Sequence, residues 1–263
     1  MELSEGCIAD ILCHTTPLDV ARISVISKIF CYAADSDTIW DQFLPSDYHS
    51  IISLSPSLAN APSKKAIYLA LFDHPIIIDQ GKKSFQLVRK SGKKCYMLAA
   101  RGLYLSFRDN EFFCRWVTVP ESRFEEVAKL KVSQRSAICG KINTVDLSPN
   151  TQYAVFLVFK PFNAHTFHCK PTLFSIRIFG GPIRTRAVCL DLRSEAMSMD
   201  DVLKCPNVRS DGLLEIEMGE FFNSGLEDGE VEMRVMMTMG KGSFYLEEIE
   251  VRPKISYPIS NSR

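Results

Sequence analysis

Residues 209–239 read RSDGLLEIEMGEFFNSGLEDGEVEMRVMMTM. Leu214, Ile216 and Met218 alternate with Leu213 and two glutamates, and every second residue from Val231 to Met239 is valine or methionine. Successive side chains of a strand point to opposite faces of a sheet, so each run predicts a strand with one buried face. Turn-forming glycine, asparagine and aspartate separate the runs. We interpret the stretch as a β-hairpin whose connection forms a shaped loop at one end of a sheet.

The loop of this predicted hairpin carries two carboxylates, Glu220 and Glu227, and the pair Phe221-Phe222. The simpler interpretation is an acidic, solvated turn that two aromatic rings anchor. The alternative is a rim of hydrogen-bond acceptors around a ligand site, which would need partners from elsewhere in the chain.

Composition describes a globular protein. The chain has 263 residues, enough for a small and a medium domain, with 46% hydrophobic and 24% charged residues. The longest purely apolar run, Ala154 to Phe159, is far too short to span a bilayer. The first five residues are acidic where a secretory signal would be basic, so we expect a protein of the cytoplasm or nucleus.

Cysteine usage and charge narrow the possible functions. The nine cysteines form no C-x-x-C pair, which favours reduced thiols and predicts neither a bound metal nor a cofactor. Residues 1–60 hold eight acidic and two basic residues, a balance of −6 in a chain of zero net charge. This asymmetry predicts two units with different surfaces. It argues against nucleic acid as the partner, and nothing in the sequence indicates a membrane partner.

The first sixty residues are predicted to form short helices. Near the start of the chain, the apolar residues Ile8, Ile11 and Leu12 have helical spacing and predict a first helix. Thr16 suits a cap position and Pro17 the first helical position. The helix that follows has an apolar stripe made of Leu18, Ala21, Val25, Ile26 and Phe30.

A third short helix is predicted from near Ser36, with Trp40 on its apolar side. Three short helices give a thin core, so we expect this unit to lean on a partner or a neighbouring domain. Residues 53–63 are rich in serine and proline and read as a linker, after which Ser63 is placed to cap a helix from Lys64 to Phe72.

The stretches LSEGCIADIL, TPLDVARISVISKIF and DSDTIWDQFLP, which together cover nearly all of residues 3–45, resemble a plant F-box. The chain departs from the family at Ser4, where proline is usual. The resemblance implies docking onto an Skp-type adaptor and, through it, membership of a cullin–RING ubiquitin ligase. The residues that it assigns to the adaptor contact are Leu3, Ile8, Ile11, Leu12, Leu18 and Trp40. The alternative is a helical cap packed on the second domain.

From Cys95 onward, short predicted strands recur with glycine and proline between them. Leu103, Leu105 and Phe107 alternate with polar neighbours, and residues 153–160 are apolar on both faces, as in a central strand. Residues 121–131 are charged and read as a loop or irregular helix. Residues 242–252 change phase at Glu247-Glu248, which predicts a β-bulge. The pattern favours an antiparallel sandwich or barrel.

Several motifs of this region, among them RWVTVPESRFEEVAKL, LSPNTQYAVFLVFK and RSDGLLEIEMGEFFN, resemble the phloem-lectin domain, also called Nictaba-like or phloem protein 2-like. The resemblance implies an α+β chain in which a small all-α F-box of three short helices precedes an all-β, jelly-roll-like sandwich. We expect the F-box at residues 1–50, a linker and entry segment at 51–94, the sandwich at 95–254 and a tail at 255–263.

The same resemblance implies a sugar site in which aromatic rings stack on the sugar and carboxylates accept its hydroxyls. The glutamates of that site match Glu220 and Glu227, whereas its two tryptophans fall on Phe107 and Cys114. Trp116 matches a neighbouring tryptophan. Loss of a stacking ring weakens sugar binding, so we expect altered glycan binding or a protein ligand.

The sequence therefore favours a non-catalytic subunit of an Skp–cullin–F-box ligase, with the sandwich binding a protein or glycoprotein target. The alternative is a carbohydrate-binding protein of the N-acetylglucosamine or N-glycan type with an inactive F-box. A hydrolase built on paired acids is a third, weaker hypothesis, because no residues are seen to position a substrate between such acids.

Overall fold

The computed structural model describes residues 5–53, 56–132, 136–163, 168–169, 171–191, 203–237 and 240–254. Its contacts divide the chain into two compact units. The first consists of Met1–Ile78 with Ser84–Cys95, and the second of Asp79–Lys83 with Tyr96–Arg263. No helix among the described residues is long and apolar enough to cross a membrane.

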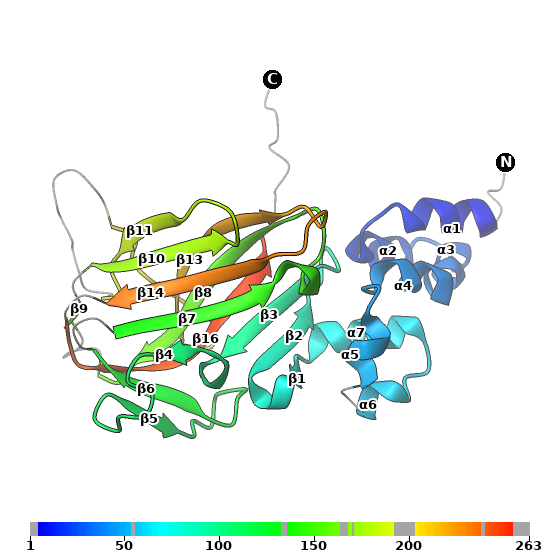
Figure 1. Ribbon diagram of the computed structural model, residues 1–263. Helices are drawn as coiled ribbons and strands as arrows, with labels where there is room; N and C mark the ends of the chain where they lie inside the picture. The colour runs from blue at the N-terminus through cyan, green and yellow to red at the C-terminus, as the bar shows by residue number, and fades with distance from the viewer. Residues whose placement is uncertain are drawn as a thin grey trace. The chain divides into compact units, whose positions relative to one another are not determined.

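The first unit is built from short helices (Figure 1): α1 (Glu5–Cys13), α2 (Pro17–Ile23), α3 (Lys28–Ala34), α4 (Asp37–Phe43), α5 (Tyr48–Ser53), α6 (Pro56–Ala59) and α7 (Lys64–Asp73). Thr16 and Ser63 cap α2 and α7 as predicted, each accepting a hydrogen bond from a backbone amide three residues ahead. Helix α6 lies inside the segment that the sequence indicated as a linker.

The predicted second helix is divided in two. Ser27 accepts a hydrogen bond from the Phe30 amide and starts α3, while the Ser24 hydroxyl donates to the Ala21 carbonyl at the end of α2. Because serine side chains compete for backbone hydrogen bonds, two serines three residues apart end one helix and begin the next. Val25 and Ile26, predicted to lie on a buried stripe, therefore lie in an exposed connection.

The core of the first unit is centred on Trp40. Its indole Nε1 donates to the Ala34 carbonyl at 2.6 Å, and its ring lies 5.1 Å from the Tyr68 ring and 5.8 Å from the Phe43 ring. Helices α4 and α7 pack against each other at this point. These rings pack with the buried aliphatic side chains of a unit whose helices are too short to be stable alone.

Strands make up most of the remaining chain. They are β1 (Ile76–Ile78), β2 (Lys83–Leu87), β3 (Lys94–Ala99), β4 (Tyr104–Leu105), β5 (Cys114–Val117), β6 (Val127–Lys131), β7 (Ser136–Asn143), β8 (Thr151–Pro161), β9 (His168–Cys169), β10 (Thr172–Ile178), β11 (Arg184–Val188), β12 (Asn207–Val208), β13 (Leu214–Asn223), β14 (Glu230–Met237), β15 (Gly240–Lys241) and β16 (Ser243–Pro253). Strand β6 lies where the sequence predicted a loop or irregular helix.

The second unit is an antiparallel sandwich (Figure 1). One sheet has the order β3-β16-β8-β13-β12, with β6 pairing with β16 and β5 with β6, and the other has the order β11-β10-β14-β7-β4. The structure thus confirms the predicted fold class, in which short N-terminal helices precede a β-sandwich. Strand β8 is central, as predicted, and so is β16, which pairs with β3, β6 and β8.

The predicted hairpin of residues 209–239 is wrong in its pairing. The alternation is correct, because Ile216 and Met218 of β13 and Val231 and Met233 of β14 are all buried. However, β13 pairs with β8 and β12 in one sheet, whereas β14 pairs with β7 and β10 in the other. The connection crosses the sandwich, so the two apolar faces pack against each other instead of sharing a ladder.

The predicted bulge in β16 is present. The pairing of β16 with β8 shifts register between Leu246 and Glu248, which leaves Glu247 as the extra residue. On one side of the bulge Leu246 is buried, and beyond it Ile249 and Val251 return to the inner face.

The two sheets approach closely at Gly140 of β7. A Cβ built there would lie 2.9 Å from Leu103 Cδ2 and 3.2 Å from the Cδ1 atoms of Ile249 and Leu98. A heavy-atom separation below 3.0 Å requires neighbouring atoms to move, so only glycine fits this inner-face position without repacking.

The Gly140→Ala variant should lower the free energy of unfolding by about 1–3 kcal/mol, because the added methyl group overpacks the interior. Urea-induced unfolding measures this change. The matched control is Gly229→Ala, whose Cβ would meet only ordinary contacts, the nearest at 3.6 Å. Equal stability of Gly140→Ala and the wild type would contradict the close approach.

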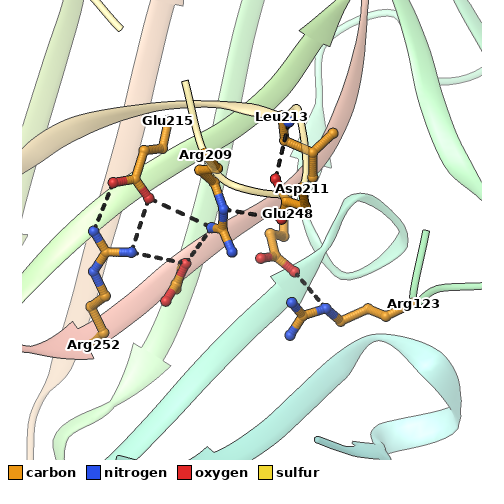
Figure 2. Close-up of polar contacts among 8 residues, drawn as sticks. Arg123, Arg209, Asp211, Leu213, Glu215, Glu248 and Arg252 are labelled. Atoms are coloured by element: carbon orange, nitrogen blue, oxygen red, sulfur yellow. Dashed lines mark hydrogen bonds and ion pairs between the residues drawn. The ribbon is translucent and has the colours of Figure 1, made fainter. Parts of the chain in front are cut away.

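A network of charged side chains covers the outer face of the first sheet. Figure 2 shows Arg209 between Asp211 and Glu215, with Arg252 bound to Glu215. Arg209 also lies 2.7 Å from Glu250. These ion pairs connect the β12–β13 segment to β16, and within them the arginine and carboxylate charges neutralise each other.

Glu248 is the most deeply buried carboxylate of this face. It is 1% exposed, and among the described residues its Oε2 accepts no hydrogen bond and forms an ion pair only with Arg123, at a long 3.7 Å. Burial raises the pKa of Glu248 to about 8, the Arg123 guanidinium opposes the rise and Glu250 adds to it. The side chain is therefore protonated near pH 7 in the folded protein.

Glu248→Gln should stabilise the protein at high pH. The unfolded carboxyl loses its proton near pH 4.5, whereas the folded one keeps it up to about pH 8, so its burial costs stability increasingly as pH rises through that window. The amide removes this cost. We expect a gain of about 1–3 kcal/mol at pH 8.5 and little change at pH 4.5.

Urea unfolding of the wild type and of Glu248→Gln at the two pH values measures the difference. The exposed Glu121 provides the control, because Glu121→Gln should leave stability unchanged at both. A Glu248→Gln variant whose effect did not depend on pH would contradict the assignment of a neutral Glu248.

Candidate functional site

The residues predicted to contact an adaptor lie in different surroundings. Ile8, Leu12 and Trp40 are buried in the helical unit itself, at 3%, 0% and 2% exposure. Leu18 is half-buried and Ile11 is 50% exposed. Leu3 lies outside the described residues. Of the described residues in this set, Ile11 thus offers the most surface to a partner, while the buried ones hold its helix in place.

An apolar surface that sequence reasoning missed surrounds Ile11. It is formed by side chains of α1, the α2–α3 connection and α3, and we call it the helical apolar surface: Ile11, Val25, Ile26, Ile29 and Tyr32. Val25 is 84% and Tyr32 73% exposed, and α1 and α2 both pack on α3. Ser24 and Ser27, which end α2 and cap α3, were the sequence signal that could have revealed it. Exposed apolar side chains on neighbouring elements are typical of a docking site.

At one end of the sandwich a groove lies between β10, β11 and β13. Two adjoining cavities of about 310 and 190 Å³ form it, and both are lined by Ile176, Arg184 and Glu220. We call it the sheet-end groove. Glu220, which was predicted as a ligand-binding residue, thus lines a groove. The residues that line it with Glu220, such as Ile176 and Arg184, come from strands β10 and β11, which the sequence analysis did not place beside it.

The shape of the groove depends on an irregularity in β13. The pairing of β13 with β8 shifts register between Glu217 and Gly219. Gly219 has φ +153°, and a Cβ there would lie 3.0 Å from Ile176 Cδ1. Glycine therefore lets β13 turn toward β10 at the groove floor.

The carboxylates of the groove are held by cations. Glu220 pairs with Lys254 and accepts from Gln152 Nε2 at 3.3 Å. Glu217 binds Arg186 at 3.0 Å and Lys204 at 3.2 Å. Burial raises the pKa of Glu217, but the hydrogen bonds from these cations outweigh it and the pKa is lowered. Both carboxylates are therefore pre-oriented acceptors.

Arg184 differs from the other charged groups of the groove. It is exposed, and among the described residues no carboxylate pairs with it. Exposed apolar side chains stand around it at the rim, namely Phe179, Ile183 and Phe222. A guanidinium that is free to bind, beside exposed rings and pre-oriented acceptors, suits a ligand with both apolar and polar groups.

Glu227 does not line this groove. It is exposed in the connection between β13 and β14, where its backbone carbonyl accepts from the Thr144 hydroxyl at 3.2 Å. The connection is anchored by the Asn223 side chain, whose Nδ2 donates to the carbonyls of Thr144 and Ser148, both at 3.1 Å.

The remaining predicted residues, Phe107, Cys114 and Trp116, lie at the other end of the sandwich. The amide of Ser106 donates to Ala137 at the start of β7, whereas Glu230, which follows the Glu227 loop, pairs with Asn143 at its end. Ala137 and Asn143 are six positions apart along β7, a span of about 20 Å. The structure does not bring the five predicted residues into one site.

Each of the three has a distinct environment. Phe107 was predicted in a strand but follows β4 in a turn with φ +62°, 45% exposed, its ring 5.0 Å from that of Phe113. Cys114 is buried, and burial raises the pKa of its thiol. Trp116 is half-buried, with the Arg101 guanidinium 3.7 Å from the ring centroid. A tryptophan covered in this way offers little open face to a sugar.

No group of three or more metal-ligating side chains occurs among the described residues. Among the described cysteines, Cys13, Cys31, Cys114, Cys139 and Cys189 form no disulfide. Besides the helical apolar surface, the sheet-end groove is a second candidate for ligand binding among the described residues.

The comparisons agree with this architecture. The family model described as phloem protein 2 matches residues 93–253. The F-box protein PP2-B13 of Arabidopsis thaliana is 38% identical over 96% of this chain and 98% of its own length. The F-box protein VBF of the same plant is 39% identical over 97% of this chain and 99% of its own length.

Among solved structures, a family 35 carbohydrate-binding module from Clostridium thermocellum aligns with 60% of this chain and 96% of its own, at 10% identity and a TM-score of 0.38. That likeness is too low to inform function. The family model and the nearly full-length relatives are sufficient: the chain belongs to the family of plant F-box proteins with a phloem protein 2 domain.

Proposed function

We propose that the chain is a substrate-recognition subunit of an Skp–cullin–F-box ubiquitin ligase. In this role the helical apolar surface binds an Skp-type adaptor, and the sheet-end groove binds a protein or glycoprotein target. The chain itself catalyses nothing. It raises the effective concentration of the target near the ubiquitin-carrying enzyme, in the cytoplasm or nucleus.

The observation that carries the proposal is the helical apolar surface. Val25, Ile26 and Tyr32 are each more than two-thirds exposed, in a unit whose helices are six to ten residues long apart from the four-residue α6. Apolar side chains that stay in water do not stabilise the isolated unit. Burying each one against a partner contributes about 1.5–3 kcal/mol to the free energy of binding. The names of the relatives, which are F-box proteins, support the same assignment.

Charged residues on this surface should abolish adaptor binding. Val25→Asp combined with Ile29→Asp places two carboxylates in the interface, and we expect the affinity for an Skp-type adaptor to fall at least about a hundredfold. Titration calorimetry with purified full-length chain and adaptor measures this.

The control for that experiment is Val145→Asp, which changes a valine of the sandwich that is 64% exposed and should bind the adaptor as the wild type does. A wild-type chain that bound no Skp-type adaptor would overturn the proposal. So would undiminished binding by the double variant.

Target binding at the groove rests on Arg184 and the aromatic rim. Arg184→Glu combined with Phe222→Asp removes the unpaired guanidinium and one exposed ring. Proximity labelling in plant cells, with and without proteasome inhibition, identifies candidate targets as the labelled proteins that the inhibitor stabilises. In the double variant, the labelling of these proteins should fall about tenfold or more relative to the wild type, because interface arginines and aromatics each contribute over 1 kcal/mol. Labelling of the adaptor should be unchanged.

The matched control is Tyr104→Asp, an exposed aromatic of β4 away from the groove, which should keep the target set. If the groove variant labelled the same inhibitor-stabilised proteins as the wild type, targets would bind elsewhere.

One observation favours the second function, carbohydrate binding with an inactive F-box. Glu220 is a pre-oriented acceptor in a groove with exposed rings at its rim, and sugars are bound by such combinations. On a glycan array, a signal abolished by Glu220→Ala would support the lectin, and silence would favour a protein target.

A further inference from the structure

A row of cations crosses the outer face of the first sheet, well away from the sheet-end groove. It consists of Arg115 of β5, Lys129 and Lys131 of β6, and Lys160 of β8, and we call it the basic row. These residues come from three separate segments, so no run in the sequence indicates the row.

The strand register puts the row on one face. Arg115 lies opposite Lys129, Lys129 opposite Tyr245 of β16, and Tyr245 opposite Lys160. The next position on each strand faces inward, where Cys114, Leu130 and Phe244 are buried. By alternation, the cations and Tyr245 all point outward, and Arg115, Lys131 and Lys160 are exposed.

The row has no internal compensation. Among the described residues, no carboxylate pairs with any of its four cations; Glu111 contributes only its backbone carbonyl, which accepts from Arg115 Nε at 3.0 Å. Like charges directly opposite each other in a sheet destabilise it. Farther along the same face, Arg209 and Arg252 are matched by Glu215 and Glu250, so the uncompensated charge is local.

Aromatic rings hold the lysines in place. Lys129 Nζ lies 3.3 Å from the centroid of Phe162, which packs edge-on against Tyr245 at 5.8 Å. Lys131 Nζ lies 3.6 Å from the centroid of Phe112. A cation fixed on a ring has lost much of its side-chain freedom already, so an anion that binds it costs less ordering entropy.

We propose that the basic row binds an extended, acidic segment of a partner protein. Lys129 and Lys131 are two residues apart on one strand, about 6.8 Å, which is also the spacing of alternate side chains in an extended peptide. Carboxylates at every second position can therefore meet successive lysines. The exposed faces of Phe112 and Phe162 offer apolar contact beside them.

The same geometry disfavours the other polyanions. Single-stranded nucleic acid gains its affinity from a series of bases stacked on open rings. Because a lysine covers one face of Phe112 and of Phe162, each ring leaves one face and the pair could stack two bases at most. An anionic membrane would gain about 1 kcal/mol per cation, and four cations alone correspond to a dissociation constant near millimolar. A peptide adds backbone and apolar contacts to the charge pairing.

This surface goes beyond the proposed function and does not depend on it, because neither the helical apolar surface nor the sheet-end groove contributes to it. Its failure and the failure of adaptor binding are therefore distinguishable in separate measurements.

The test uses full-length protein and fluorescence anisotropy. The probe is a labelled peptide of about ten residues in which glutamate and valine alternate. We expect saturable binding that weakens as salt rises. Lys129→Glu combined with Lys160→Glu should weaken it at least about tenfold. Lys129→Gln with Lys160→Gln removes the two charges without reversing them and should weaken peptide binding less. This second variant provides the test if the first does not fold.

A matched control separates the site from net charge. Lys82→Glu with Lys28→Glu changes net charge by the same amount at exposed positions outside the row and should bind the peptide like the wild type. A labelled uridine oligonucleotide and phosphatidylserine vesicles should bind more weakly than the peptide. The proposal is overturned if the peptide does not bind, if the control variant weakens binding as much, or if the oligonucleotide or vesicles bind more tightly.

Discussion

Burial of two apolar sheet faces against each other is the interaction on which the sandwich depends. Strands β13 and β14 show it most directly, because their alternating valines, methionines and isoleucine enter one interior from opposite sheets. At Gly140 the sheets are so close that a methyl group would collide. With the inner faces fully used, binding groups can stand only on the outer faces, at strand ends and in loops.

The outer surfaces differ in how charge is compensated. Around Arg209 and Arg252, carboxylates and guanidiniums neutralise each other and tie β12–β13 to β16. In the sheet-end groove, Glu217 and Glu220 are held by cations while Arg184 remains open. Along the basic row, no carboxylate in the described part of the chain pairs with a cation. Compensated charge stabilises the fold, and uncompensated charge at defined positions is available to a partner.

Much of this fold could be predicted from the sequence wherever the signal was local. The caps at Thr16 and Ser63, the alternation in β13 and β14, and the bulge at Glu247 follow from a few neighbouring residues. Strand pairing was missed, because alternation says which side chains are buried but not which strand shares the ladder. Glu220 was predicted in a loop but lies in strand β13, and Ile176 and Arg184 reach it only through tertiary folding. The basic row likewise could not be predicted from the sequence, because its residues align only through the register of β5, β6, β16 and β8.

The central position of β16 has a consequence for how the protein is made. This strand, residues 243–253, forms ladders with β3, β6 and β8, so one sheet stays split until it arrives. On the ribosome, the helices can collapse early, while β3, β6 and β8 must wait with exposed edges for β16 to be translated. Such long sequence separations slow folding. A nascent chain stalled before residue 243 would be a candidate for chaperone capture rather than a half-built sandwich.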